Sequence, residues 1–532
     1  MHRFLLSTAV ILLTTVNLDG QISDSLRLGN IKASVAFNGG LFRDSQIRGR
    51  FVYKPGGKIA VFAGASWITG RDSLGNSRAA IQEYALPSAT LANTESDFTP
   101  GPVANSYTNA QYAKRYHRVW RVTRAQIETH RRNYNSLSYT MPEVIQNWPA
   151  QGDINNGEAA LLAPFKDVNN NNQYEPILGE HPIIAGDEAI YVIFNDSNRV
   201  NTRFSGKPLG VEVHLMAYAY DRPADTALSN SIFLHYRVVN RSSRDYSNFI
   251  YAQWNDFDLG NPVDNSYLSD TIRQMALEYN ADPDDDGALG FGSHPPAVGV
   301  VDLNGQSKGH MGYYNRLVRD FRFAAPQNAR EVELYLNHRW RDSSFLKVEK
   351  PNGDGHAPGS SLPRTTWIFG QWSPDSLPSL RAFRSLLNST PQTLPAGGSL
   401  CFDYAYVMAR DTNSNNDLFG SVNKIQRQLP RVKQAFAQTY FECSQRTFDL
   451  PERAKVRKLG VEVFPNPARH QVRLQFAERQ TEVTASLYSV DGRLMKQRSW
   501  HKTQGATLHF KLPAGLYVLE VERIRAATTV KC

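Results

Sequence analysis

The sequence predicts an all-β protein, mainly antiparallel with few short helices, in which a large β-rich body is followed by a small β-sandwich. Three observations predict this class. Aromatic residues form 11% of the 532 residues, and 36 glycines and 28 prolines supply frequent turns, a composition typical of many short strands rather than long helices. Apolar stretches of strand length recur throughout the body. Strand-like segments separated by turn residues then fill the last part of the chain.

Strands are predicted in the body wherever apolar residues alternate with polar ones or run without a break. The predicted strands are 57–69, 189–194, 209–219, 231–239, 250–254, 332–335, 366–371 and 400–408. Three helices are also expected. One occupies the second half of 112–132, after Thr123, which can cap a first turn. The others are 381–387 and 420–436, where four apolar residues share a helical face although Pro430 is expected to kink or divide the helix.

The first 20 residues have the pattern of a secretory signal peptide. His2 and Arg3 give a positive start, and an apolar run at 5–16 follows. This run is too short to span a bilayer as a helix, and we expect cleavage before Gln21. No other stretch approaches 18 consecutive apolar residues, so no transmembrane segment is expected.

The net charge of +9 is concentrated at one end of the chain. Residues 451–532 carry 15 Lys or Arg against 7 Asp or Glu, so this segment holds eight of the nine excess positive charges. The body is therefore close to neutral. Nucleic-acid binding needs a basic patch on the binding domain, and this distribution argues against it.

Three cysteines remain after the signal peptide: Cys401, Cys443 and Cys532. In an oxidising compartment Cys401 and Cys443 can pair across the end of the body, which leaves Cys532 unpaired. Two free buried thiols are the alternative. No cysteine has the ligand spacing of a zinc site.

The last part of the chain carries three spaced motifs. They are Phe464-Pro465-Asn466-Pro467, Val490-Asp491-Gly492-Arg493 and Leu512-Pro513-Ala514-Gly515-Leu516-Tyr517. In this order they resemble the type A C-terminal sorting domain of the Bacteroidota type IX secretion system, an Ig-like β-sandwich. The extreme end departs from that pattern, because Lys531-Cys532 stands where a short basic tail is usual.

The resemblance implies an organisation and a destination. Residues 1–20 are the signal peptide, 21–445 the exported body, 446–458 a linker in which the tail is removed, and 459–532 the sorting domain. It also implies passage through the periplasm to the cell surface or the medium, with the type IX machinery as the partner of the tail.

A second resemblance covers roughly 51–440. The segments FAGASWITG at 62–70, GEHPIIAGDEAIYVIFND at 179–196 and DFDLGNP at 256–262 resemble a recurrent body found in Bacteroidota proteins that carry the sorting tail. That family has no established activity, so the resemblance implies neither a substrate nor a catalytic residue. The body departs from the pattern at Ser269, where a Gly-Cys-Asp triplet is common, and at Asn172, where a glycine is common.

One candidate calcium loop lies at 167–175. Asp167, Asn169 and Asn171 carry oxygens at alternate positions, Asn172 can take the left-handed conformation, and Glu175 completes a set of hard oxygen ligands of the kind that Ca²⁺ takes. The loop is not an EF-hand, because position 12 is leucine. The alternative is an asparagine-rich turn capped by its own side chains.

A second candidate calcium loop is Asp282, Asp284 and Asp286 followed by Gly287. Three like charges within five residues repel unless a cation or water separates them, and the glycine permits the sharp turn of many Ca²⁺ loops. Ser293 at position 12 excludes a complete EF-hand. The alternative is a solvated acidic turn.

Sequence motifs of common enzymes are missing: there is no G-x-S-x-G, H-E-x-x-H or phosphate-binding loop. Two functions remain. The first is a secreted or surface β protein that binds a glycan or protein ligand and is stiffened by calcium loops. The second is a hydrolase acting on polysaccharide or peptide, in which the carboxyl groups of Asp256 and Asp258 serve as acid and base. The sequence favours the first because it shows no complete catalytic set.

Overall fold

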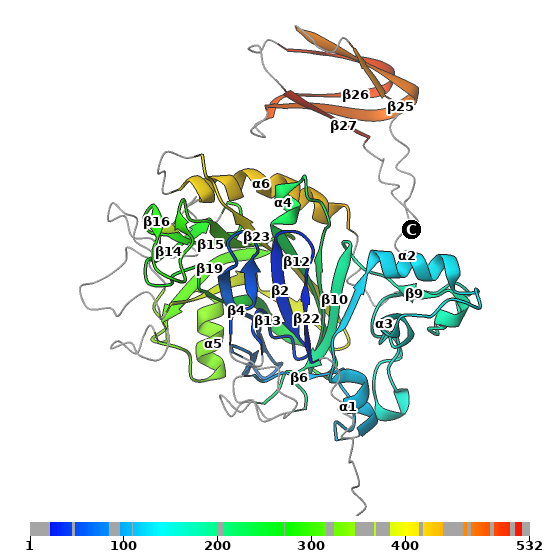
Figure 1. The fold of residues 1–532 in the computed structure, drawn as a ribbon, viewed down its shortest axis with the longest axis vertical. Coiled ribbons are helices and arrows are strands. Elements are labelled where there is room, and N and C mark those ends of the chain that lie inside the picture. The colour runs from blue at the N-terminus through cyan, green and yellow to red at the C-terminus, as the bar shows by residue number, and fades with distance from the viewer. Residues whose placement is uncertain are drawn as a thin grey trace, which may run out of the picture. The chain divides into compact units, whose positions relative to one another are not determined.

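The structure, a computed structural model, forms two compact units at 1–448 and 449–532 (Figure 1). The described residues are 22–44, 48–84, 96–108, 110–198, 207–270, 272–314, 324–345, 367–368, 383–413, 419–439, 461–464, 470–489, 494–510 and 517–523. The expected signal peptide (1–20), the linker (446–458), Cys443, Cys532 and the motif at 490–493 lie outside them, as does most of the motif at 512–517.

Two large antiparallel sheets build the body, and the all-β prediction is confirmed. The first sheet has the order β1 (Ser23–Leu26), β2 (Ile31–Ala36), β3 (Phe51–Tyr53), β4 (Lys58–Arg71), β13 (Tyr246–Phe257), β21 (Phe383–Ser389), β19 (Ser307–Tyr314); β5 (Ser77–Ile81) pairs with β4, and β22 (Gln392–Leu394) with β13. The second has the order β20 (Trp367–Ile368), β14 (Asn265–Asp270), β15 (Met275–Asn280), β18 (Ala297–Asp302), β23 (Ser399–Ala409), β12 (Ser231–Asn240), β11 (Val211–Ala219), β10 (Glu188–Asn195), β6 (Thr99–Pro100), and β7 (Trp120–Thr123) pairs with β10.

Short elements complete the body. Two small ladders join β8 (Phe165–Lys166) to β9 (His181–Pro182) and β16 (Asp284–Asp285) to β17 (Gly292–Ser293). The described α-helices are α1 (Ala110–Tyr116), α2 (Arg124–Asn133), α3 (Glu143–Gln146), α4 (Thr226–Ser229), α5 (Ala329–Leu336) and α6 (Gly420–Ala437), with 3₁₀ turns η1 (Ile154–Asn156) and η2 (Pro176–Leu178). No helix in the described part of the chain is long and apolar enough to cross a membrane.

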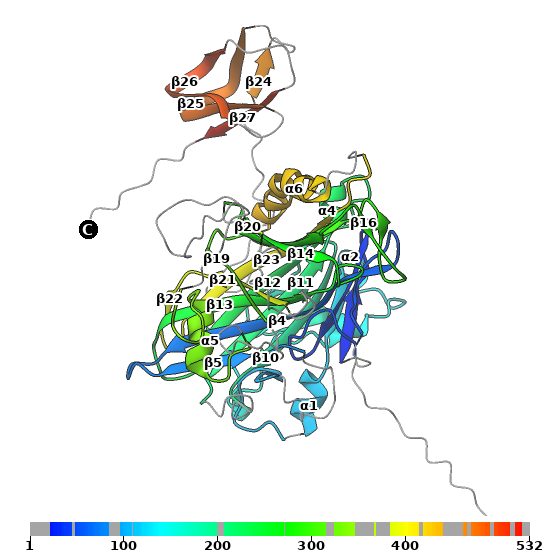
Figure 2. The same ribbon diagram turned by 90° about the vertical axis from the view of Figure 1, so that its left-hand side faces the viewer.

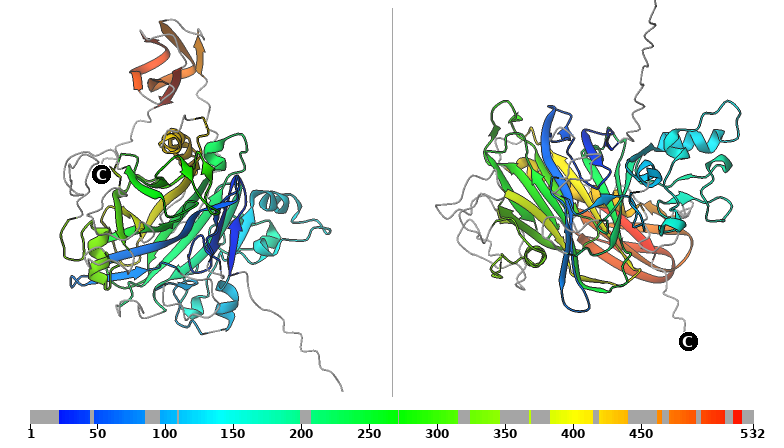
Figure 3. Two further views of the ribbon diagram at one scale, coloured as in Figure 1. Left: turned by 60° about the vertical axis from the view of Figure 1, so that its left-hand side comes forward. Right: turned by 90° about the horizontal axis from the view of Figure 1, so that it is seen from below.

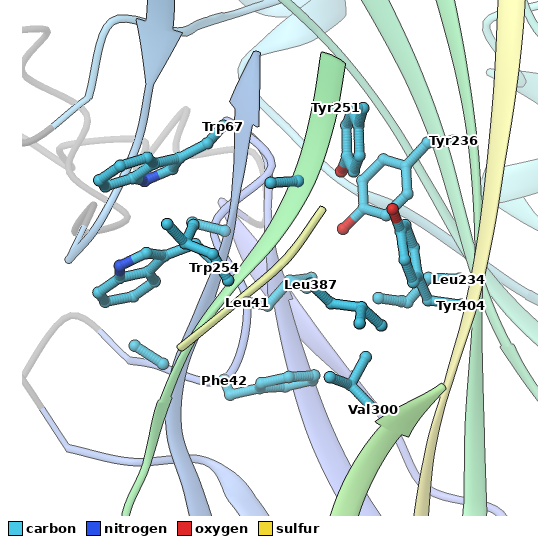
Figure 4. Packing of buried hydrophobic residues seen from close by; sticks show 14 of the residues in the cluster. Leu41, Phe42, Trp67, Leu234, Tyr236, Tyr251, Trp254, Val300, Leu387 and Tyr404 are labelled. Atoms are coloured by element: carbon cyan, nitrogen blue, oxygen red, sulfur yellow. The ribbon is translucent and has the colours of Figure 1, made fainter. Parts of the chain in front are cut away.

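The main core lies between the inner faces of the two sheets (Figure 4). Tyr251 of β13 stacks on Phe402 of β23 with ring centroids 4.7 Å apart, and its hydroxyl bonds the Ser66 hydroxyl at 2.7 Å. Leu387 of β21 is 1% exposed in the same core. Full burial of one such side chain stabilises the fold by about 1.5–3 kcal/mol.

Helix α6 covers the outer face of the second sheet and lies over β15, β18 and β23 (Figure 2). Its buried residues Val422, Ile425, Leu429 and Val432 form the apolar stripe that the sequence predicted, and they join a second core that includes Leu277 and Val407. Pro430 sits inside the single helix. Helix α2 also follows its prediction, because Thr123 and Gln126 form a capping box at its start.

Two predicted elements are wrong. Residues 332–335, expected as a strand, belong to helix α5, because Asn328 caps the helix and Val332, Tyr335 and Leu336 bury one helical face. Residues 381–387, expected as a helix, enter strand β21, which pairs with β13 on one side and β19 on the other. Pairing on both edges outweighs local helical preference.

Cys401 of β23 is buried and disulfide-bonded. The other two cysteines of the chain lie outside the described residues. The pairing with Cys443 therefore stays a prediction.

The C-terminal unit is a four-stranded antiparallel sheet (Figure 3). Strand β25 (Gln471–Ser489) pairs with β26 (Leu494–His509) along one edge, and with β24 (Val461–Phe464) and then β27 (Tyr517–Arg523) along the other. The register shifts between Gln475 and Gln480. Its own core contains Leu474, Phe476 and Val483.

Truncating the core between the sheets tests the sandwich. We expect Leu387→Ala to lower the free energy of unfolding of the body by about 2–5 kcal/mol, because it removes buried contacts and leaves a cavity. Urea denaturation of the mature protein measures this change. The matched control Leu74→Ala, at a side chain that is 85% exposed, should change stability by less than about 0.5 kcal/mol. Equal effects of the two substitutions would contradict the packing described.

Candidate functional site

A cluster of carboxyl groups lies where β13 ends. Asp256 is on β13 and 3% exposed, Asp258 follows the strand and is half-buried, and Glu278 of β15 is 0% exposed. Side chains two residues apart share a face of a strand, so Asp256 lies on the face of β13 that carries the buried Trp254, opposite to Tyr251. The register between β13 and β4 shifts between Asp256 and Phe257, and such bulges re-aim side chains.

The Asp256 carboxylate is held at both oxygens. The Tyr84 hydroxyl donates to Oδ2 at 2.8 Å, and Nη1 of Arg384 lies 2.9 Å from Oδ1. Arg384 belongs to β21 and lies opposite Asp256, one position beyond the Asn255–Ser385 pair. Its Nε also contacts the Tyr84 hydroxyl. The guanidinium of Arg43 lies 5.1 Å from the Tyr84 ring centroid and donates to the Tyr84 carbonyl oxygen at 2.8 Å.

Glu278 belongs to β15 of the second sheet, whereas Asp256 and Arg384 belong to the first. Its Oε1 accepts hydrogen bonds from the Asn265 side-chain amide and, at 3.4 Å, from the Leu259 amide. Its Oε2 is buried and has no hydrogen-bond partner among the described residues. The Asp258 carboxylate makes no hydrogen bond with any residue that the structure describes, so it lacks the contacts that usually compensate buried charge.

Burial governs the protonation of the cluster. Loss of hydration, reinforced by the nearby Asp256 charge and opposed by Arg384, raises the pKa of Asp258 to about 8. Burial and the Asp258 charge raise the pKa of Glu278 well above its ordinary value. Burial also raises the pKa of Asp256 against the opposing effect of Arg384. Among these carboxyl groups, Asp256 is the one that directly contacts the guanidinium.

The cluster therefore combines a carboxyl group paired with a guanidinium and two carboxyl groups whose pKa values are raised by burial. In many active sites, neighbouring carboxyl groups have different pKa values because their environments differ. One group can then act as an acid while the other stabilises charge. Within the described ranges, no three His, Cys, Asp or Glu side chains are arranged to hold a metal ion.

The loop at 167–175 brings its four predicted ligands together. The Glu175 carboxylate accepts from the side-chain amides of Asn169 at 2.9 Å and Asn171 at 2.6 Å, and Asp167 accepts from the backbone amide of Asn172 at 2.8 Å. Asn172 has a φ of 58°, the left-handed conformation expected for it. The side-chain oxygens of Asn169 and Asn171 accept from the backbone amides of Asn171 at 3.1 Å and Gln173 at 2.7 Å. These are the bonds of a turn capped by its own side chains.

The loop at 282–287 has a different arrangement. The side chains of Asp282, Asp284 and Asp286 are exposed, and Asp282 accepts from the Asp284 amide at 2.9 Å. The intervening Asp285 points inward and accepts from the amides of Asn261 at 3.0 Å and Phe291 at 2.8 Å. Asp285 therefore anchors the loop, although it was not among the predicted calcium ligands.

A second buried network joins β10 and β11. His214 bonds Tyr191 through Nδ1 and Glu212 through Nε2, each at 2.8 Å, and Glu212 also pairs with Arg241 at 2.6 Å. Burial would raise the pKa of Glu212, but His214 and Arg241 lower it to about 2. Glu212 also accepts from the Val103 amide at 2.8 Å. Glu212 thereby ties Val103 to strand β11.

Sequence reasoning identified Asp256 and Asp258 but missed Arg384, Tyr84 and Glu278. The Tyr84–Arg384 contact spans 300 positions of the chain. A single sequence carries no local signal for a contact of that kind.

The C-terminal unit defines the class of the protein. Residues 462–532 match the family model described as the secretion system C-terminal sorting domain. The match supports a cargo of the type IX secretion system, which implies interaction of the tail with that machinery. It also implies export, with a secreted or cell-surface location.

Two solved structures are remotely similar to parts of the chain. The chain is 10% identical to a polysaccharide lyase, with a TM-score of 0.18 over 57% of this chain and 31% of that protein, so it spans about a third of the lyase. It is also 10% identical to a GalM/aldose epimerase homologue from C. elegans, with a TM-score of 0.24 over 74% of this chain and 99% of that one. Likeness this low says nothing of substrate. Comparison with curated protein sequences gives no match.

The raised pKa of Asp258 predicts a stability that depends on pH. The folded protein binds this proton more tightly than the unfolded chain, so the stabilisation is present at acid pH and is lost as pH rises from the ordinary value of 3.8 towards about 8. Asp258→Asn cannot ionise. We expect wild-type stability to fall relative to this variant by at most about 1.4 kcal/mol per pH unit over that range.

Urea denaturation at a series of pH values measures the difference between the two proteins. The exposed-site control Asp221→Asn should keep the wild-type slope, because the Asp221 side chain is exposed. Parallel pH profiles for wild type and Asp258→Asn would show that Asp258 titrates normally.

Proposed function

We propose that the chain is a Bacteroidota type IX cargo whose body, a member of an uncharacterised family of exported proteins, binds a glycan or protein ligand at the cell surface. The single observation that supports export is the C-terminal sorting domain at 462–532. A signal peptide at 1–20 carries the chain into the periplasm, and the tail is removed within 446–458. The near-neutral body, free of the excess positive charge of the tail, suits a ligand other than nucleic acid.

Deletion of 459–532 tests the export step. The two units have separate cores, so the truncated body should still fold and should accumulate in the periplasm instead of reaching the surface or medium. Cell fractionation with immunoblotting measures its location. Export of the truncated protein at the wild-type level would contradict the role of the tail.

The proposal includes calcium at one or both acidic loops. The loop at 167–175 has the stronger support, because hydrogen bonds already bring its four predicted ligands together. Glu175 accepts from the side chains of Asn169 and Asn171. The backbone amide of Asn171 donates to Asp167 and Asn169. The loop at 282–287 is supported by the crowding of three exposed carboxylates, a charge that a cation would neutralise.

Calcium should raise the melting temperature of the mature protein, and a chelator should reverse the shift. Saturation to 100 times the dissociation constant adds about 2.7 kcal/mol of stability. We expect Glu175→Gln to weaken the response and the control Glu143→Gln, at a carboxylate that is 71% exposed, to leave it intact. Asp284→Asn tests the other loop. If neither calcium nor chelator changes the melting temperature, calcium is no part of the function.

The carboxylate cluster at the end of β13 favours a second candidate function, a hydrolase acting on polysaccharide or peptide. The specific observation is that Asp258, which is half-buried and makes no hydrogen bond with described residues, lies two positions after Asp256, whose carboxyl is held by Tyr84 and Arg384. Binding and hydrolysis are compatible in one exported protein, because an enzyme also holds its substrate.

A further inference from the structure

We propose that Arg237, on the outer face of the second sheet, anchors a binding site for a single carboxylate carried by an acidic peptide segment of a protein ligand. This inference rests on the proposed binding function and names the chemistry of its ligand. It does not depend on export, on calcium or on the carboxylate cluster at the end of β13.

Arg237 is a buried cation without a partner. Only two arginines are buried in the described part of the chain, Arg43 at 7% exposed and Arg237 at 6%. Arg43 donates to the Tyr84 carbonyl oxygen at 2.8 Å. Arg237 forms no hydrogen bond or ion pair with any residue that the structure describes, and its Nε is fully buried. Arginine keeps its charge in proteins and is almost never buried unless it is paired, so this guanidinium calls for an anion.

The strand register places the Arg237 side chain. Its neighbours along β12, Tyr236 and Val238, belong to the main core between the sheets, so Arg237 lies on the opposite, outer face. There it lies directly opposite His214 of β11 on one side and Cys401 of β23 on the other. Side chains in such positions have their Cβ atoms about 4.5–5.5 Å apart. These two residues therefore form the side walls of the site.

Neither wall supplies the missing negative charge. The imidazole of His214 is bonded at both nitrogens, to the Tyr191 hydroxyl and to Glu212, each at 2.8 Å. Burial, opposed by Glu212 and assisted by the charge of Arg237, lowers the pKa of His214 to about 4, so the imidazole is uncharged near neutral pH. Cys401 is disulfide-bonded and carries no charge.

Two carboxylates share this face of the sheet, and both are taken by other groups. Glu212 of β11 already accepts hydrogen bonds from three residues. Asp403 of β23 bonds the imidazole of His235 at 2.7 Å. Neither forms an ion pair with Arg237. Because both would repel added negative charge, a ligand group with one negative charge fits this site better than a dianion.

Shape selects the carrier of that charge. A guanidinium is a planar fork whose parallel N–H groups match the two oxygens of a carboxylate. Since only 6% of Arg237 is exposed, the group that reaches it has to stand at the end of a slender stem. A glutamate side chain has such a stem, whereas the carboxylate of an acidic saccharide is attached directly to a sugar ring. An acidic peptide therefore fits better than an acidic glycan.

Arg237→Met separates a ligand anchor from a residue that stabilises the fold through its charge. Methionine keeps a long unbranched side chain and removes the charge. Replacing a buried charge by a well-packed apolar residue is often neutral or stabilising, so the melting temperature of the mature protein should stay the same or rise. The matched control Arg132→Met, at an exposed arginine, should leave both stability and binding unchanged.

Binding is measured by fluorescence anisotropy with the full mature protein and a library of labelled peptides, in which each peptide with one central glutamate is paired with its glutamine counterpart. We expect a subset of the glutamate peptides to bind, and their glutamine counterparts to bind about 30-fold more weakly or worse, the loss that follows removal of one member of a buried charge pair. Arg237→Met should show the same loss. Arg237→Lys should lose less, because it keeps the charge without the fork.

The inference is wrong if Arg237→Met lowers the melting temperature, if this variant binds the glutamate peptides as tightly as wild type, or if no peptide pair differs. Oligosaccharides of uronic acids are titrated in parallel, and binding of these alone that depends on Arg237 would reject the peptide as the carrier. A glycan or protein that binds wild type and Arg237→Met equally would leave the proposed function intact and reject Arg237 as its anchor.

Discussion

Apolar contact between the inner faces of two antiparallel sheets is the interaction on which the body depends. Strand β13 lies within the first sheet, and both of its faces are used. Tyr251 on the inner face stacks on Phe402 of the second sheet, whereas Asp256 on the opposite face meets Arg384. The same strand therefore builds the core and positions the carboxylate cluster, so the rigidity of the core is passed on to the site.

Buried carboxylates in this protein differ in their hydrogen-bond donors. Asp196 accepts from three backbone amides, those of Leu209, Gly210 and Val211, and Asp285 accepts from two. Glu278 accepts from the Leu259 amide and the Asn265 side-chain amide. Burial nevertheless raises the pKa of Asp196 to about 6 and also raises the pKa of Asp285. Hydrogen bonds therefore offset only part of the cost of burying these carboxylates.

Much of the fold follows from local pattern. The apolar stripe of α6, the cap at Thr123 and the long strands of both sheets are visible in the sequence because each depends on residues near one another in the chain. Strand β21 is not visible in the sequence, because it is stabilised by pairing with β13 and β19, and both strands are remote from it in the chain. The site divides in the same way. Asp256 and Asp258 lie two positions apart and were identified, whereas Tyr84, Glu278 and Arg384 are brought to them by sheet pairing that a single sequence does not encode locally.

The pairing of β4 with β13 joins residues such as Ser66 and Tyr251, which are 185 positions apart. Closing so long a loop costs conformational entropy before any contact compensates for it, and chains dominated by such remote pairings fold slowly. The central strands must therefore spend time unpaired after synthesis, with their backbone N–H and C=O groups open to pairing with other chains. For an exported protein, correct folding of the sandwich therefore depends on chaperones that protect the unpaired strands. It also depends on the order in which the strands are synthesised.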